Sequence, residues 1–156
     1  MISIDTNILF AALDVDHAFH CQASDFIDSM AERSEVIISE LVLVELYILL
    51  RNPVVMSEPL TASAAVEVCE SFRQHPQWQV IGFPPDSRFF HDTFWPRLRT
   101  PNFARRRAFD WRVALSLLQQ GVTEFATVNE KDFQGFGFKR VWNPLALPPG
   151  KPQEAV

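Results

Sequence analysis

The chain has 156 residues, with 19 acidic against 14 basic side chains and a net charge of −5. Hydrophobic residues make up 47% of it, enough for a packed core, which excludes a disordered chain. Its most apolar stretch, residues 36–50, is interrupted by a serine and two glutamates, which excludes a membrane span. Cys21 and Cys69 form no CxxC pair, and residues 1–5 lack the basic start of a secretory signal. We therefore expect a soluble cytoplasmic protein.

Short apolar runs alternate with segments of helical spacing along the chain. This alternation predicts an α/β fold in which a central parallel sheet carries helices on both faces. We expect one domain over residues 1–145, followed by a flexible proline-rich tail over residues 146–156. The predicted strands are residues 2–4, 36–38, 78–83, 124–128 and 139–142, and the predicted helices are residues 8–12, 17–33, 40–51, 60–74, 87–98 and 103–120.

Four acidic residues stand where local structure favours other side chains. Asp5 directly follows the first predicted strand, where helix capping is its alternative role. Asp132 lies in the predicted loop after the fourth strand, where Glu130 competes for the same role. Glu45 and Asp110 share helical spacing with apolar residues, so each is costly to bury unless a partner neutralises it. The alternative for Glu45 is a place at the rim of the core, reaching solvent, and that for Asp110 is an exposed ion pair with the arginine four residues earlier. Because strand ends and the first turns of the following helices share one sheet edge, we expect these acids to meet there.

Carboxylates gathered at one edge cannot all stay ionised without a cation, because like charges raise one another's pKa. Oxygen ligands favour a hard cation such as Mg²⁺ or Mn²⁺. Such a cation binds phosphate oxygens and activates a water molecule for in-line attack. The four acids therefore predict a metal-dependent phosphodiester hydrolase.

Four segments, in this order along the chain, resemble the PIN-domain ribonucleases, and specifically the VapC toxins of VapBC toxin–antitoxin pairs. The resemblance covers nearly the whole chain, to about Leu145. The segments are ISIDTN at residues 2–7, ISELVLVE at 38–45, FDWRVAL at 109–115 and FATVNEKDF at 125–133.

The resemblance implies a Mg²⁺ or Mn²⁺ cofactor and the cleavage of structured RNA such as tRNA or rRNA. It also implies a cognate VapB-type antitoxin that blocks the site, and a homodimer or a toxin–antitoxin hetero-oligomer. Many relatives carry Arg or Asp where this chain has Val128 or Asn129, which leaves Asp132 preferred over Glu130 as the fourth acid. By the resemblance, the metal-binding and catalytic acids are Asp5, Glu45, Asp110 and Asp132, and the supporting residues are Thr6, Asn7, Thr127 and Asn129.

A net charge of −5 is unexpected for an RNA-binding enzyme, because phosphate contacts dominate affinity. However, six of the 14 basic residues fall within the 16 residues from 97 to 112. A solvated helix face is the alternative interpretation of this run. Phe103 and Trp111 lie in the same segment, where we expect core packing, with stacking on unpaired bases as the alternative. The predicted RNA-contacting residues are Arg97, Arg99, Arg105, Arg106, Arg107 and Arg112.

Two other classes of function fit part of the pattern. A phosphotransfer domain would use Asp5 as its acid site, but it needs a second acid close by, and the Asp5-Thr6-Asn7 run supplies only one. A catalytically inactive PIN-like scaffold would bind RNA or a partner without cutting. A scaffold has no need of four acids, and metal-dependent turnover separates it from an enzyme.

Overall fold

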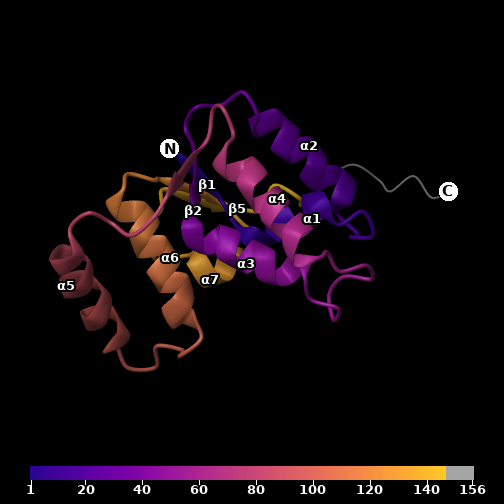
Figure 1. The fold of residues 1–156 in the computed structure, drawn as a ribbon. Coiled ribbons are helices and arrows are strands. Elements are labelled where there is room, and N and C mark those ends of the chain that lie inside the picture. The colour runs from indigo at the N-terminus through magenta and orange to yellow at the C-terminus, as the bar shows by residue number, and fades with distance from the viewer. Residues whose placement is uncertain (147–156) are drawn as a thin grey trace.

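The computed structural model describes residues 1–146, and of the predicted tail only Ala146 lies within this range (Figure 1). Seven helices and five strands alternate along the described chain. No helix within residues 1–146 is long and apolar enough to cross a membrane. In chain order the elements are β1 (Ile2–Ile4), α1 (Thr6–Leu13), α2 (His20–Met30), β2 (Val36–Ser39), α3 (Glu40–Leu50), α4 (Ala62–Arg73), β3 (Gln79–Ile81), α5 (Ser87–Leu98), α6 (Arg107–Gln119), β4 (Glu124–Ala126), α7 (Glu130–Phe133) and β5 (Arg140–Trp142).

The five strands form one parallel sheet in the order β3-β2-β1-β4-β5. The first strand is therefore central: Ile2 is in register with Val36 of β2 on one side and with Glu124 of β4 on the other. The chain order reverses at β1, and in open parallel sheets ligands bind beyond the carboxyl ends of strands at such a point. This topology places Asp5, the residue after β1, at the middle of that edge.

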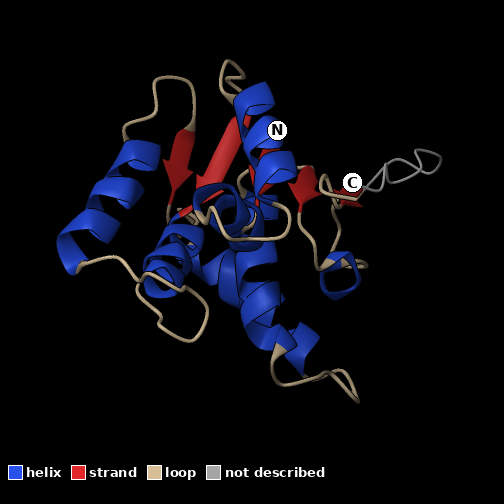
Figure 2. Ribbon diagram, turned by 90° about the vertical axis from the view of Figure 1, so that its right-hand side faces the viewer, coloured by secondary structure: helices blue, strands red, loops and turns tan. Residues whose placement is uncertain are grey.

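The sheet lies between two helical layers (Figure 2), because alternate residues of its buried strands face opposite sides. Val36 and Ile38 of β2 pack with α1, α2, α3 and α4, whereas Ile37 packs with α5, α6 and α7. The second layer is rich in aromatic side chains, including Phe90 and Phe125. The predicted parallel sheet with helices on both faces is confirmed.

Several predicted segments have different boundaries or structure. The strands predicted over residues 78–83 and 124–128 are shorter, Gln79–Ile81 and Glu124–Ala126. The helix predicted over residues 17–33 is shorter, because hydrogen-bonded turns occupy residues 14–20 before α2. The helix predicted from residue 103 begins at Arg107, because the residues before it form separate hydrogen-bonded turns, in which Phe103 N–H donates to the Thr100 carbonyl and Arg107 N–H to the Ala104 carbonyl. The predicted loop over residues 129–133 forms the short helix α7.

Candidate active site

Asp5 is a buried carboxylate at the carboxyl end of the central strand, only 9% exposed. It caps α1, and its Oδ1 accepts the Thr6 backbone N–H at 2.8 Å. Its Oδ2 accepts the Thr127 hydroxyl at 2.5 Å and the Asn7 amide at 2.8 Å. Burial raises the pKa of Asp5 to about 6, the Thr127 hydrogen bond opposes this rise, and the negative charge of Glu45 adds to it.

Glu45 reaches the same edge from α3. The Thr6 hydroxyl donates to Glu45 Oε2 at 2.7 Å, so Thr6 binds both acids, one through its backbone and one through its side chain. Of the two interpretations of Glu45, the structure agrees with a place at the rim of the core and not with burial among the apolar residues of α3. That helix buries Val42, Leu46 and Leu50, whereas Glu45 lies on its exposed side and Ile48 is 57% exposed.

Asp110 approaches from the opposite side, in the first turn of α6, and is half-buried. Burial raises its pKa, the charges of Asp132 and Glu45 raise it further, and Arg107 and Arg106 oppose the rise. Asp110 therefore lies within electrostatic reach of two other predicted acids. Asp132 and Glu130 lie in the same short helix, α7, and the choice of Asp132 as the fourth acid stays a prediction.

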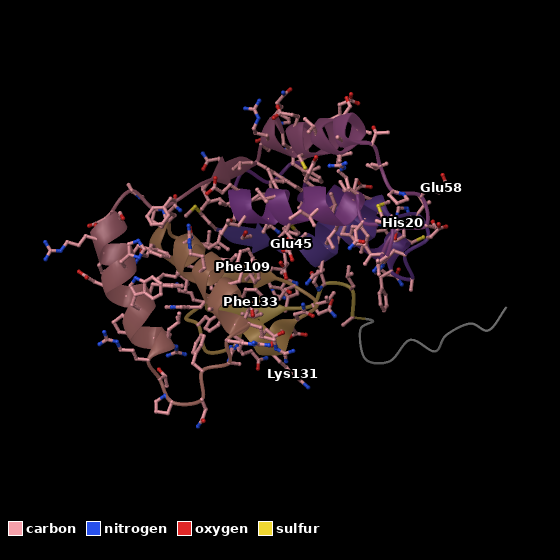
Figure 3. All side chains as sticks on the ribbon, turned by 60° about the horizontal axis from the view of Figure 1, so that its bottom comes forward. His20, Glu45, Glu58, Phe109, Lys131 and Phe133 are labelled. Atoms are coloured by element: carbon pink, nitrogen blue, oxygen red, sulfur yellow. The ribbon has the colours of Figure 1, made fainter. Side chains whose placement is uncertain are left out.

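Three of the four predicted acids line one cleft of about 120 Å³. Asp132 lines a separate depression beside it, formed by residues 128–132. Figure 3 shows Glu45, Phe109 and Phe133 together where α3, α6 and α7 meet. The cleft is lined by Asp5, Thr6, Asn7, Val42, Glu45, Leu49, Phe109, Asp110, Val113, Asn129 and Phe133.

Thr127 joins the polar residues behind Asp5. It is fully buried just after β4, and while its hydroxyl donates to Asp5 it accepts the Asn7 amide at 3.1 Å and the Asn129 backbone N–H at 3.0 Å. The side-chain oxygen Oδ1 of Asn7 in turn accepts the Val128 backbone N–H at 3.3 Å. The four predicted supporting residues are thus brought together: Thr6, Asn7 and Thr127 bind an acid directly, and Asn129 does so through Thr127.

Known proteins resemble this chain in sequence and in fold. The PIN domain family matches residues 2–87, more than half of the chain. The chain belongs to the PIN-domain family. It is 46% identical to ribonuclease VapC24 of Mycobacterium tuberculosis over 145 residues, which cover 93% of this chain and 97% of that protein. The resemblance found in the sequence is thereby confirmed.

Solved structures with the same fold are more distant in sequence. The crystal structure of VapC20 from Mycobacterium tuberculosis, described as a sarcin–ricin loop cleaving toxin, has a TM-score of 0.59 at 18% identity and covers 80% of this chain and 87% of its own. FitAB bound to a DNA fragment has a TM-score of 0.62 at 19% identity, covering 95% of this chain and 98% of its own. The FitAcB structure from Neisseria gonorrhoeae also has a TM-score of 0.62 at 19% identity, covering 94% of this chain and all of its own. These likenesses concern the fold.

PIN ribonucleases generally use a divalent metal ion, and the donor set of this PIN-domain cleft fits one. Its acidic ligands are oxygens, which hard cations prefer, and the pKa values of Asp5 and Asp110 are raised partly by neighbouring acids. Within residues 1–146, no three His, Cys, Asp or Glu side chains converge closely enough to bind an ion together. This spacing suits Mg²⁺, which commonly keeps several waters and takes only one or two carboxylates directly.

The six predicted RNA-contacting arginines occupy different environments. Arg107 donates to the Asp132 backbone carbonyl at 2.6 Å, and Arg97 donates to that of Gly135 at 3.1 Å. The Arg112 guanidinium lies 4.8 Å from the centres of two aromatic rings, and burial lowers its pKa. The other three are exposed and form no ion pair among the described residues: Arg99, Arg105 and Arg106.

The structure also identifies a cleft residue that sequence reasoning did not single out. Phe109 lines the cleft and is 49% exposed, whereas Trp111, the aromatic residue two positions later, is only 6% exposed. The expected core role of Trp111 is confirmed. Its position directly before Asp110 could have indicated Phe109. Sequence spacing alone, however, does not say whether Phe109 or Trp111 faces solvent.

Proposed function

We propose that this PIN-domain protein is a metal-dependent endoribonuclease toxin of the VapC type, which hydrolyses phosphodiester bonds in structured RNA such as tRNA or rRNA. The observation that carries the proposal is the cleft in which Asp5, Glu45 and Asp110 converge from three elements at the sheet edge. The 46% identity to a ribonuclease over nearly the full chain supports the same chemistry.

The proposed cofactor is Mg²⁺ or Mn²⁺. One or two of Asp5, Glu45 and Asp110 would bind the ion directly and the others through its water molecules, and Asp132 would act through its charge from the neighbouring depression. When bound, such an ion supplies positive charge to the phosphate oxygens and lowers the pKa of a water molecule for in-line attack. In that arrangement Asp132 would contact the water molecules around the ion and not the ion itself. The Arg107 guanidinium donates to the Asp132 backbone carbonyl, and this hydrogen bond ties α7 to α6 and maintains that position.

The polar residues orient the carboxylates. Both oxygens of Asp5 are fixed by hydrogen bonds from the Thr6 backbone N–H, Asn7 and Thr127. Because these bonds prevent the side chain from rotating, the fold determines where its remaining lone pairs point. Thr6 holds Glu45 in the same way from a neighbouring helix. Fixed acceptors of this kind need no reorganisation when charge develops in the reaction, which is the main advantage of a preorganised site.

RNA is proposed to approach over the basic segment that precedes α6. Arg99, Arg105 and Arg106 are exposed there, and Arg106 stands one turn before Asp110. The other three arginines contact neighbouring parts of the protein: Arg97, Arg107 and Arg112. We propose that they mainly support this surface and bind phosphate where their side chains remain accessible. The negative net charge is compatible with this path because local distribution governs the approach of a polyanion.

The proposed partner is a VapB-type antitoxin that blocks the cleft. The proposed location is the cytoplasm, where RNA substrates are abundant. An apolar depression adjoins the cleft and shares Asn7 and Leu49 with it, and Phe10 and Phe19 contribute to its lining. An amphipathic helix of an antitoxin fits such a surface. We further propose a homodimer or a toxin–antitoxin hetero-oligomer.

The deciding experiment is cleavage of total RNA by purified, antitoxin-free protein, with Mg²⁺ or Mn²⁺ and with EDTA. Asp5→Asn is compared with Asp25→Asn, a matched change of an exposed acid on α2. We expect discrete metal-dependent cuts that only Asp5→Asn abolishes. Binding of RNA without any cutting would favour the scaffold, and cutting that survives both EDTA and Asp5→Asn would overturn the mechanism.

A further inference from the structure

We propose that Phe109 is a stacking platform for one unpaired nucleobase of the RNA substrate. The inference rests on the proposed function, since it takes the acid cleft as the place where RNA is cut. It adds a base-binding subsite to the site for the sugar–phosphate backbone that the proposed function assigns to the acids.

The first observation is the exposure of the ring. Phe109 lies in the first turn of α6, directly before Asp110, with 49% of its surface exposed. It stacks against no other ring among the described residues, whereas the exposed Trp95 is stacked on His91. The only other aromatic side chain that lines the cleft, Phe133, is 5% exposed and belongs to the core. Phe109 is therefore the cleft aromatic with a free face.

The second observation is the mixed character of the cleft. Its acids share the lining with apolar residues: Leu49 of α3 is partly exposed, whereas Val42 of α3 and Val113 of α6 are 2% and 5% exposed. Neither a hydrated metal ion nor a phosphate gains from apolar walls. A nucleobase does, because its flat faces are apolar and its edges are polar, and stacking on an aromatic side chain is a common way to bind one.

The third observation is the order of side chains at the start of α6. Arg105 and Arg106 are exposed, then Phe109, then the half-buried Asp110. Cation, ring and acid thus follow one another within six residues, the arginines just before α6 and the ring and acid in its first turn. This order matches a nucleotide, whose phosphate pairs with an arginine and whose base stacks on a ring. The base must be unpaired, because a base inside a duplex offers no free face.

The test measures binding separately from cutting. All variants are made in the Asp5→Asn background, and an end-labelled single-stranded RNA of mixed sequence is titrated in a fluorescence-anisotropy assay. Phe109→Ala is expected to weaken binding by about tenfold, and Phe109→Trp to stay close to the parent. Phe109→Leu keeps an apolar side chain without a ring and is expected to behave like Phe109→Ala. The matched control is Phe89→Ala, which removes a 58% exposed phenylalanine from α5, outside the cleft.

Two comparisons make the outcome specific to a base. The same sequence as a perfect RNA duplex is expected to be insensitive to every change at Phe109. In the catalytically intact protein, Phe109→Ala is expected to lower kcat/KM on a cleaved RNA and to have no effect when the base next to the cut is replaced by an abasic ribose.

Three results overturn the inference: equal effects of Phe109→Ala and Phe89→Ala, full binding by Phe109→Leu, or equal weakening of binding to single-stranded and duplex RNA. Failure of the proposed function is recognised separately. It is indicated by RNA binding without any cutting, or by cutting that survives both EDTA and Asp5→Asn, whatever the behaviour of the Phe109 variants. An unchanged melting temperature for each variant excludes unfolding as the cause of weaker binding.

Discussion

The Thr127 hydroxyl donates a 2.5 Å hydrogen bond to Asp5 Oδ2 across 122 residues of sequence. It does so because β4 lies next to the central strand β1, so the residues that follow the two strands meet at one edge. The bond stabilises the ionised form of a carboxylate whose burial favours the protonated form. Thr127 therefore adjusts both the orientation and the charge of the central acid.

Removing that hydroxyl is predicted to damage activity more than folding. Thr127→Val keeps the shape of the side chain but deprives Asp5 of a donor and leaves the Asn7 amide without one acceptor. We expect cleavage to fall about 10- to 100-fold, as for other residues that orient metal ligands. Thr127→Ser retains the hydroxyl and is expected to keep most of the activity. Initial rates at several Mg²⁺ concentrations measure this, and equal activity of the valine and serine variants would contradict the assigned role.

The raised pKa of Asp5 predicts a stability that depends on pH in the absence of metal. The folded-state pKa of about 6 exceeds the ordinary value of 3.8 for an aspartate. Folding is therefore favoured by protonated Asp5 below pH 3.8, and this contribution is lost as the pH rises through 6. The size of the loss is at most about 3 kcal/mol. Urea unfolding in EDTA at a series of pH values should show this slope for the natural protein and not for Asp5→Asn.

Divalent cations are predicted to reverse this loss of stability at neutral pH. An ion that binds the folded cleft and not the unfolded chain stabilises the protein by about 2.7 kcal/mol at a concentration about 100 times its Kd. The melting temperature should therefore rise by several degrees when Mg²⁺ or Mn²⁺ is added to protein freed of metal. The rise should disappear in Asp5→Asn and Asp110→Asn and persist in Asp25→Asn. An equal rise in all four proteins would point to non-specific ion binding instead.

Chain topology explains which parts of the site the sequence could predict. Asp5 follows one predicted strand and Thr127 lies near the end of another, and the ends of parallel strands share an edge, so their meeting follows from the fold class alone. The orientation of Glu45 did not follow, because α3 is apolar around most of its circumference and its spacing gives no unique buried face. Packing against α1 and the sheet decides that face.

The sequence also could not predict which of two nearby aromatic side chains is buried. Phe109 and Trp111 have the same apolar character in sequence, yet one is 49% and the other 6% exposed. Which of them enters the core depends on α5, whose Phe94 backbone carbonyl accepts the Trp111 indole N–H at 3.4 Å. A contact to an element elsewhere in the chain cannot be found from local periodicity.

The arginines are predicted to divide into two groups by the effect of their removal. Arg105→Gln and Arg106→Gln should weaken RNA binding across all sequences, and the salt slope of affinity should fall by about one for each phosphate that is no longer neutralised. Arg112→Gln should leave that slope unchanged and lower the melting temperature, because its guanidinium packs on Phe83 and Phe90. Anisotropy titrations of labelled RNA at several salt concentrations, together with thermal melts, measure both effects. A reduced slope for Arg112→Gln at an unchanged melting temperature would instead show that Arg112 binds phosphate, and unchanged slopes for Arg105→Gln and Arg106→Gln would move the RNA path away from the start of α6.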